Sequence, residues 1–199
     1  SSYDVTVTLT LDDNTTVQGS RSIFVGPGTR YIPGHTIYGE ETWYSGGTYV
    51  VQSYITIAQG AKLIIEPGAE IRLSNSAWIS VQGTLNATGA KFTWADGENP
   101  WWEIRFSGAG ASGSRLENCE FEHSTGYAYG NAVIVIASSS PTIIGCTINN
   151  ITAVYGILLT GSSSPVIRNS TISGFNLGID VSSSSSPIIT GCRLTGNET

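Results

Sequence analysis

Three glutamates and a histidine stand close together in residues 116–123, which read LENCEFEH. Glu120 and Glu122 are two positions apart, so in an extended strand both side chains leave the same face, with His123 beside them. Most polysaccharide hydrolases use such a carboxylate pair, one group as acid and the other as base or nucleophile. Glu120, Glu122 and His123 are therefore the candidate catalytic residues of this sequence.

Aromatic residues gather on both sides of this stretch. Trp101, Tyr127 and Tyr129 could offer their ring faces to sugars, and they are the candidate glycan-binding residues. Trp94 and Trp102 belong to the same cluster. The alternative is packing, because Trp102 alternates with two apolar residues along one strand face, whereas Trp101 lies on the opposite face.

The three cysteines, Cys119, Cys146 and Cys192, follow no metal-binding spacing such as C-x-x-C. A thiol nucleophile needs a nearby base, and the only histidines are His35 and His123. On adjacent coils about 4.8 Å apart, Cys119 and Cys146 would also be within reach of a disulfide. Cysteine otherwise serves as a small buried hydrophobic residue, which is the interpretation that we favour. We therefore expect no metal and no cofactor.

Charge and hydropathy narrow the range of partners. Nine basic against fifteen acidic residues give a net charge of −6, and no Lys/Arg cluster stands out, which argues against nucleic acid. No apolar run reaches the length of about 18 residues that a membrane span needs. Charged residues make up only 12% of the chain, which favours an extracellular β-protein. If it is exported, five sequons are candidate glycosylation sites: Asn14, Asn86, Asn150, Asn169 and Asn197.

An internal repeat must position these residues. The tract SSSP occurs at 138–141, 162–165 and 184–187, each time as a turn whose proline opens a short apolar strand. The strand core that follows also occurs three times upstream without the SSSP tract, for example as TGAKF at 88–92. Six copies therefore succeed one another at intervals that are typical of a solenoid.

Each position of the repeat core has its own chemistry. The first is always Gly or Asn, which predicts a left-handed bend. The second is small and the fourth large and apolar, so these two face a core, while the third faces outward. In chain order the first position holds Gly68, Gly89, Asn118, Gly145, Asn169 and Gly191, and the second holds Ala69, Ala90, Cys119, Cys146, Ser170 and Cys192. The third position holds Glu70, Lys91, Glu120, Thr147, Thr171 and Arg193. The fourth holds Ile71, Phe92, Phe121, Ile148, Ile172 and Leu194.

Two or three short strands in each repeat, with no helical period, predict an all-β parallel solenoid of about six coils. Residues 60–71, 101–106 and 165–174 resemble the right-handed parallel β-helix repeats of the pectin-lyase-like superfamily, closest to those of bacterial and archaeal surface proteins. The resemblance implies a right-handed β-helix over residues 48–199. It leaves function open, because that superfamily includes lyases, hydrolases, tailspikes, adhesins and structural proteins.

Residues 1–47 do not follow the repeat and are expected to form an N-terminal β cap or arm. Val5, Val7, Leu9 and Leu11 alternate with threonines, which predicts a half-buried strand. One role for such a segment is to close the end of the solenoid. The other is to contact a neighbouring subunit through these four residues.

Two functional hypotheses follow. The hydrolases of the superfamily carry paired aspartates followed by a His-Gly motif, and no such motif is present here. Glu70, Lys91 and Glu120 also alternate in charge on the outward position, as structural cross-strand pairs do. We therefore favour a non-catalytic extracellular or cell-surface structural protein of a fibre, sheath or surface layer, with other copies of itself or surface proteins as partners. The alternative is a polysaccharide-binding module or a polysaccharide lyase or hydrolase.

Overall fold

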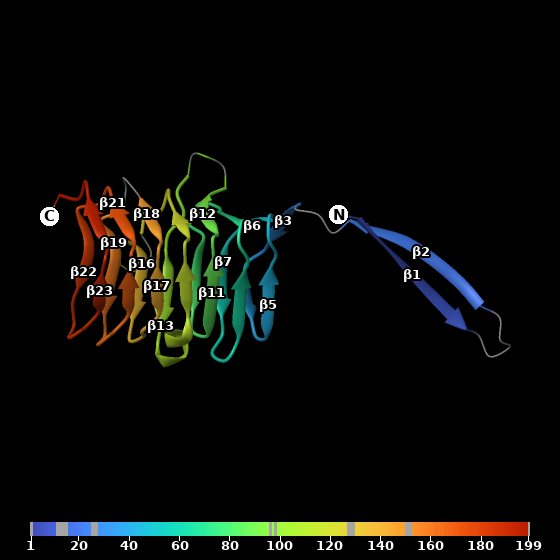
Figure 1. Cartoon of the computed structure of the whole chain (residues 1–199), viewed down its shortest axis with the longest axis horizontal. Coiled ribbons are helices and arrows are strands. Elements are labelled where there is room, and N and C mark those ends of the chain that lie inside the picture. Colours follow the sequence, from blue (N-terminus) through green and yellow to red (C-terminus); the bar gives the residue numbers. More distant parts are fainter. Residues whose placement is uncertain are drawn as a thin grey trace.

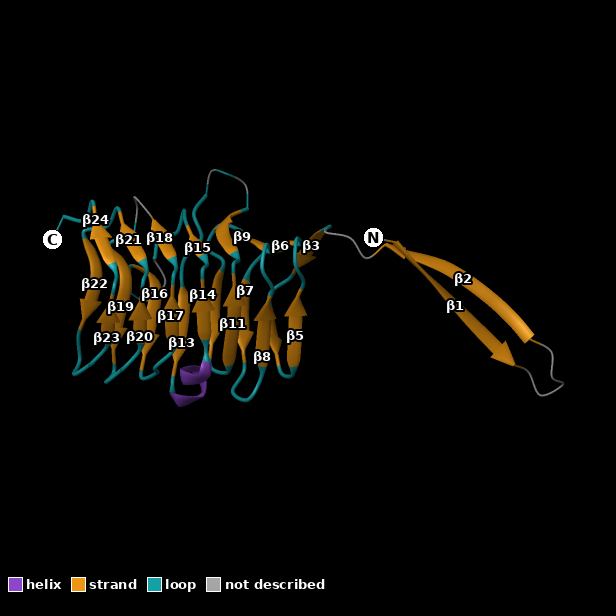
Figure 2. Ribbon diagram, viewed as in Figure 1, coloured by secondary structure: helices purple, strands orange, loops and turns teal. Residues whose placement is uncertain are grey.

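A computed structural model describes residues 2–10, 16–24, 28–95, 97, 99–126, 130–149 and 153–198. Three parallel sheets wind around one axis and stack about seven turns into a β-solenoid (Figure 1). Strands account for nearly all of its regular structure, and the short 3₁₀ helix η1 (Ala109–Gly113) is the exception among the described residues (Figure 2). No helix in the described part of the chain is long and apolar enough to cross a membrane.

Every complete turn of the solenoid contributes one strand to each sheet. Sheet 1 consists of β3 (Thr29–Ile32), β6 (Thr48–Val51), β9 (Glu70–Leu73), β12 (Lys91–Trp94), β15 (Glu120–Phe121), β18 (Thr147–Asn149), β21 (Thr171–Ser173) and β24 (Arg193–Thr195). Sheet 2 consists of β4 (His35–Ile37), β7 (Tyr54–Ile57), β10 (Trp78–Val81), β13 (Ile104–Ser107), β16 (Ala132–Ala137), β19 (Tyr155–Thr160) and β22 (Leu177–Val181). Sheet 3 consists of β5 (Glu40–Trp43), β8 (Lys62–Ile65), β11 (Thr84–Thr88), β14 (Arg115–Glu117), β17 (Thr142–Ile144), β20 (Val166–Arg168) and β23 (Ile188–Thr190).

The predicted bends are confirmed at the corner between sheets 3 and 1. All six Gly or Asn residues of the first repeat position have a positive φ, between 51° at Asn169 and 79° at Gly68. The predicted small position is buried in five copies, and the large apolar residues behind it are buried in all but the last turn. The SSSP turns stand between sheets 2 and 3, and their prolines directly precede β17, β20 and β23.

Identical side chains stack through the core. Ile55, Ile79, Ile104, Ile134 and Ile157 pair in register along sheet 2, and all are fully buried. Burying an isoleucine side chain contributes about 1.5–3 kcal/mol, so such columns supply much of the stability of the solenoid. The parallel register also carries outward residues to fixed positions on each face, and this is what positions the candidate site.

The solenoid begins earlier than predicted. Strands β3, β4 and β5 pair with β6, β7 and β8, so the first turn starts at Thr29, whereas the sequence placed the boundary between residues 47 and 48. A seventh repeat core, Gly46-Gly47-Thr48-Tyr49, was missed, although Gly46 has the expected positive φ of 68°. About seven turns thus replace the six predicted.

The first turn lies at one end of the core. Arg30, His35 and Glu41 occupy register positions that point inward in the next turn, where Tyr49, Ile55 and Leu63 stand. His35 Nε2 lies 3.5 Å from Glu41 Oε2, so these polar groups pair with each other. These three polar residues stand where the next turn has apolar ones, whereas Ile32, Ile37 and Trp43 continue the other apolar columns. The closing role expected of residues 1–47 remains a prediction.

Strands β1 (Ser2–Thr10) and β2 (Thr16–Phe24) form an antiparallel two-stranded sheet of their own, hydrogen-bonded to no other described strand. The predicted strand around Val5, Val7 and Leu9 is therefore confirmed, and its pairing with β2 is an addition to the prediction. Leu11 lies outside the described residues. The predicted contact of this strand with another subunit remains a prediction.

Candidate functional site

Charged residues of both signs collect on the outer face of sheet 1, over β9, β12 and β15. Lys91 lies in register between Glu70 on one side and Glu120 on the other. In the neighbouring column Thr93 pairs with Arg72, and Glu122 follows directly after β15, its backbone N–H donating to the Phe92 carbonyl at 3.0 Å. Glu120 and Glu122, which we call the acid pair, therefore flank the same lysine.

Lys91 binds both members of the acid pair. Its ammonium Nζ lies 2.7 Å from Glu122 Oε1 and 3.9 Å from Glu120 Oε2. The hydrogen bond to Glu122 raises the pKa of Lys91. Partial burial works to raise the pKa of Glu122, but hydrogen bonds from Lys91 and Thr93 outweigh it and hold that pKa below its usual range. Both groups of this ion pair are thus charged at neutral pH.

A histidine and a tryptophan stack beside the acid pair. The ring centroids of His123 and Trp94 are 3.9 Å apart and the rings are 2° from parallel. His123 Nδ1 lies 3.1 Å from Thr93 Oγ1 and 3.5 Å from Glu122 Oε1. β15 has only two residues because the chain turns at His123, whose φ of 60° is left-handed. This turn sets the imidazole over the indole of the preceding coil.

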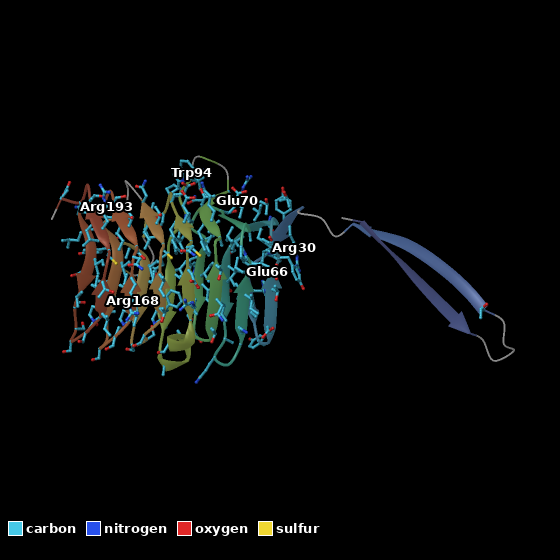
Figure 3. The ribbon with its side chains drawn as sticks, in the orientation of Figure 1. Arg30, Glu66, Glu70, Trp94, Arg168 and Arg193 are labelled. Carbon is cyan, nitrogen blue, oxygen red and sulfur yellow. The ribbon has the colours of Figure 1, made fainter. Side chains whose placement is uncertain are left out.

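An open hollow of about 370 Å³ lies over these residues. Trp94 lines it together with the charged side chains of Glu70, Arg72, Lys91 and Glu122, and Arg72 binds Glu70 at 2.9 Å. Figure 3 shows Glu70 and Trp94 near the same edge of the solenoid. The hollow therefore combines an aromatic ring with donors and acceptors that their partners already hold in place.

A family model of the right-handed β-helix region matches residues 9–198, nearly the whole chain. The chain belongs to the right-handed β-helix family. No curated protein and no solved structure matches it significantly. Right-handed β-helices occur both as structural proteins or adhesins and as polysaccharide-active proteins, so the family supports the fold and leaves the choice of function to the site.

In this β-helix the predicted catalytic residues Glu120, Glu122 and His123 do come together on one face. The alternative prediction, structural pairing of charges across strands, applies to the same face, because Glu70, Lys91 and Glu120 lie in register and alternate in charge as expected. What the sequence could not reveal is that Lys91 contacts both carboxylates, because Glu122 lies beyond the end of β15 and belongs to another column.

The prediction for Trp101 is wrong. Its side chain is fully buried, and its indole Nε1–H donates to the Glu122 carbonyl at 2.8 Å, so it anchors the turn below the hollow. The sequence argument assumed that side chains alternate between two strand faces from Trp101 onward. It failed because β13 begins only at Ile104, and Trp101 makes an isolated bridge with Ser124. Trp94 is the ring that lines the hollow. Tyr127 and Tyr129 lie outside the described residues.

The cysteines occupy the small inward position, with Cys119 2% and Cys146 1% exposed, which agrees with their expected role as small core residues. All three thiols are free in the structure. Among the described residues, no three His, Cys, Asp or Glu side chains group in a way that could hold a metal ion.

The sequons differ in how they present their amides. Asn169 is exposed at a left-handed corner, whereas Asn86 lies within β11 with its Oδ1 buried. Asn197 uses both amide atoms, since Nδ2 donates to the Ile172 carbonyl at 3.2 Å and Oδ1 accepts from the Phe175 N–H at 3.1 Å. Asn14 and Asn150 lie outside the described residues.

Proposed function

We propose that this β-helix is a non-catalytic structural protein that works outside the cell, in a surface, fibre, sheath or surface layer, and associates with other copies of itself or with surface proteins. The observation that carries the proposal is the position of Lys91 between the two carboxylates of the acid pair. This position matters because Glu120, Glu122 and His123 are the residues whose types suggested catalysis.

Glycoside hydrolysis by two carboxylates needs one of them to hold a proton near neutral pH, and enzymes achieve this by raising its pKa. Here the Lys91 ammonium does the opposite, because its hydrogen bond helps to lower the pKa of Glu122. Glu120 faces the same ammonium at 3.9 Å. The acid pair therefore has the electrostatics of a structural ion-pair lattice, in which Glu122 is held in its charged form.

The rest of the molecule supports a scaffold role. Beyond the charged lattice, the outward residues of sheet 1 are mainly uncharged, such as Thr147, Asn149, Thr171 and Ser173. Only 12% of the chain is charged. Stacked turns with a continuous core make a rod whose faces are available for lateral contacts.

Incubation with a panel of neutral and acidic polysaccharides tests the absence of catalysis, with new reducing ends and unsaturated products as the readouts. We expect no turnover by the wild-type chain. Turnover that disappears in Glu120→Gln or Glu122→Gln would overturn the proposal, and Glu40→Gln, at an exposed ion pair with Lys62 on sheet 3, serves as the control.

A second candidate function, glycan binding without cleavage, is favoured by the presence of Trp94 in the hollow. An indole face matches the apolar face of a pyranose ring, and paired Lys, Arg and Glu side chains offer both donors and acceptors to sugar hydroxyls. Because one face of Trp94 stacks on His123, the ring is held in place before a ligand arrives.

Affinity electrophoresis in gels that contain each polysaccharide tests this candidate. Binding would retard the wild-type chain, and Trp94→Ala would restore its mobility. Tyr38→Ala is the matched control, since Tyr38 is 84% exposed and does not line the hollow. Equal mobility of wild type and Trp94→Ala in every gel would remove this candidate and leave the scaffold proposal unaffected.

A further inference from the structure

Two cysteines occupy the same position in neighbouring turns. Glu120 pairs with Thr147 in register, and the Thr147 N–H donates to the Cys119 carbonyl at 2.9 Å, so Cys119 and Cys146 stand side by side. Neighbouring strands lie about 4.8 Å apart, which sets the separation of the two Cα atoms. Disulfides bridge Cα atoms about 4.4–6.8 Å apart, and this position falls within that range.

The two thiols also adopt the same orientation. Cys119 Sγ lies 3.4 Å from the carbonyl oxygen of Glu117, and Cys146 Sγ lies 3.5 Å from that of Ile144, each two residues earlier in the chain. The two thiols are close enough to shift each other's pKa, and both face the core. Parallel side chains on adjacent strands need only a small approach of their Cβ atoms for an S–S bond.

The third cysteine cannot take part without a large rearrangement. Ser170 fills the same position in the next turn, where its Oγ accepts the Cys146 N–H at 3.1 Å, and Cys192 follows one turn later. Two strand spacings separate Cys146 from Cys192, about 9.6 Å, which is beyond the reach of a disulfide. The geometry therefore selects a single pair.

We propose that Cys119 and Cys146 form a disulfide that joins two successive turns when the chain folds in the presence of a small-molecule disulfide such as oxidised glutathione. Two S–H bonds are lost and one S–S bond forms. The two protons and two electrons reduce one glutathione disulfide to two glutathione thiols. The carbonyls of Glu117 and Ile144 lose a thiol donor, but each still accepts a backbone N–H at 2.8 Å, from Gly89 and Asn118 respectively.

The bond forms while the chain folds, before the turns close over the thiols. In the native chain both thiols are almost fully buried. Their mutual contact raises the pKa of the Cys146 thiol and lowers that of Cys119, but burial keeps both sulfurs away from an oxidant in solution. Native reduced protein should therefore resist the oxidant that cross-links a refolding chain.

The cross-link also bears on the candidate site. The loop that it closes runs from Cys119 to Cys146 and contains the acid pair and His123. It ties the start of this loop to the strand β18 of the following turn. By restricting the unfolded chain, a disulfide of this loop length should raise the midpoint of thermal unfolding by several degrees.

The test is to unfold the reduced chain in guanidinium chloride and refold it with reduced and oxidised glutathione. Thiols are then counted in denaturant, and the cross-link is located by peptide mapping without reductant. We expect the free thiols to fall from three to one, with Cys192 as the remaining thiol. Three free thiols after oxidative refolding, or a cross-link that includes Cys192, would overturn the proposal.

Matched variants keep the test decisive. Cys192→Ser should form the same bond and leave no free thiol. Cys119→Ala should form no intramolecular bond, and it should fold because Ala69 and Ala90 fill the same position in other turns. Its thermal midpoint should match that of wild type under reducing conditions and fall below it after oxidative refolding; equal midpoints after oxidation would contradict the predicted stabilisation. These readouts count thiols and stability, so they stand apart from the proposed function.

Discussion

Asparagine and glycine at the sheet 3–sheet 1 corner depend on each other from one turn to the next. A Cβ atom added to Gly145 would overlap the side-chain oxygen of Asn118, and one added to Gly191 would overlap that of Asn169. Asn118 and Asn169 themselves adopt left-handed φ values of 52° and 51°. An Asn in one turn therefore requires a Gly in the next, a rule that the chemistry of single positions does not reveal.

We predict that Gly145→Ala lowers the free energy of unfolding by more than the strain of a left-handed alanine alone, which is about 1–2 kcal/mol. Gly60→Ala is the control, because Gly60 has φ +82° and an added Cβ would meet no atom within 4 Å, so it carries the strain without the clash. Urea unfolding of both variants gives the difference. Asn118→Gly combined with Gly145→Ala should return the loss to the Gly60→Ala value, and an unchanged loss would refute the pairing rule.

The Lys91–Glu122 ion pair should make stability depend on pH in a defined direction. The folded-state pKa of Glu122 is lowered, so its contribution is present above the unfolded pKa of about 4.3 and is lost as the pH falls through the folded value. The pKa of Lys91 is raised, so its contribution is present below about 10.4 and is lost as the pH rises through the folded value.

Urea unfolding between pH 3 and 7 measures the acid side of this effect, which we expect to be about 1 kcal/mol or less because the pair is partly exposed. Lys91→Met should flatten that part of the profile. Lys62→Met, in the more exposed pair with Glu40, is the comparison and should flatten it less. An identical flattening by both variants would contradict a special role for Lys91.

Side chains at the same inward position contribute to the stability of the fold according to how deep in the stack of turns they lie. Phe92 and Phe121 stack at 4.7 Å in the middle of sheet 1, whereas Leu194 holds the same position in the last turn and is 50% exposed. Phe121→Ala should lower the free energy of unfolding by about 3–5 kcal/mol through the cavity that it leaves. Leu194→Ala should lower it by about 1 kcal/mol or less, and similar losses in thermal or urea unfolding would show that the column does not pack as described.

The sequence predicted those strands in which each repeat position holds its usual residue type: Gly or Asn at the first, a small residue at the second and a large apolar residue at the fourth. The first turn escaped detection because Arg30, His35 and Glu41 stand at inward positions. In addition, the second and fourth positions of the repeat core that follows hold Gly47 and Tyr49, residue types that the other six copies do not have there. Gly47 is required there, since a Cβ would lie 2.8 Å from the Tyr49 ring. End turns differ from interior turns because they meet solvent on one side, and a repeat search based on interior turns passes over them.

The candidate site shows the same limit. The acid pair was predictable from the alternation within one strand, but its electrostatics depend on Lys91, 29 and 31 residues earlier in the chain, and on a register that only the stacked turns define. Trp94 was passed over in favour of Trp101 because strand parity was extended to residues that form no strand. Contacts within one strand could be inferred, and contacts between irregular corners could not.

At the scale of the whole molecule, the β1–β2 sheet is the part that the solenoid does not explain. It pairs with no other described strand, and an isolated two-stranded sheet is marginally stable in water. Along β1, Val5, Val7 and Leu9 alternate with threonines, a pattern typical of a strand that buries one face. We therefore expect this sheet to gain stability from a second copy of the chain, in line with the proposed self-associating scaffold.

Light scattering over a range of protein concentrations measures this association. Val5→Thr, Val7→Thr and Leu9→Thr together should reduce the mean assembly mass, because they remove apolar area and preserve strand propensity. Thr6→Val and Thr8→Val form the control, since they keep the strand and leave the three apolar residues in place. If the triple variant and the wild type assemble equally, contact through β1 is excluded, and the lateral faces of the solenoid become the surfaces by which the scaffold would have to associate.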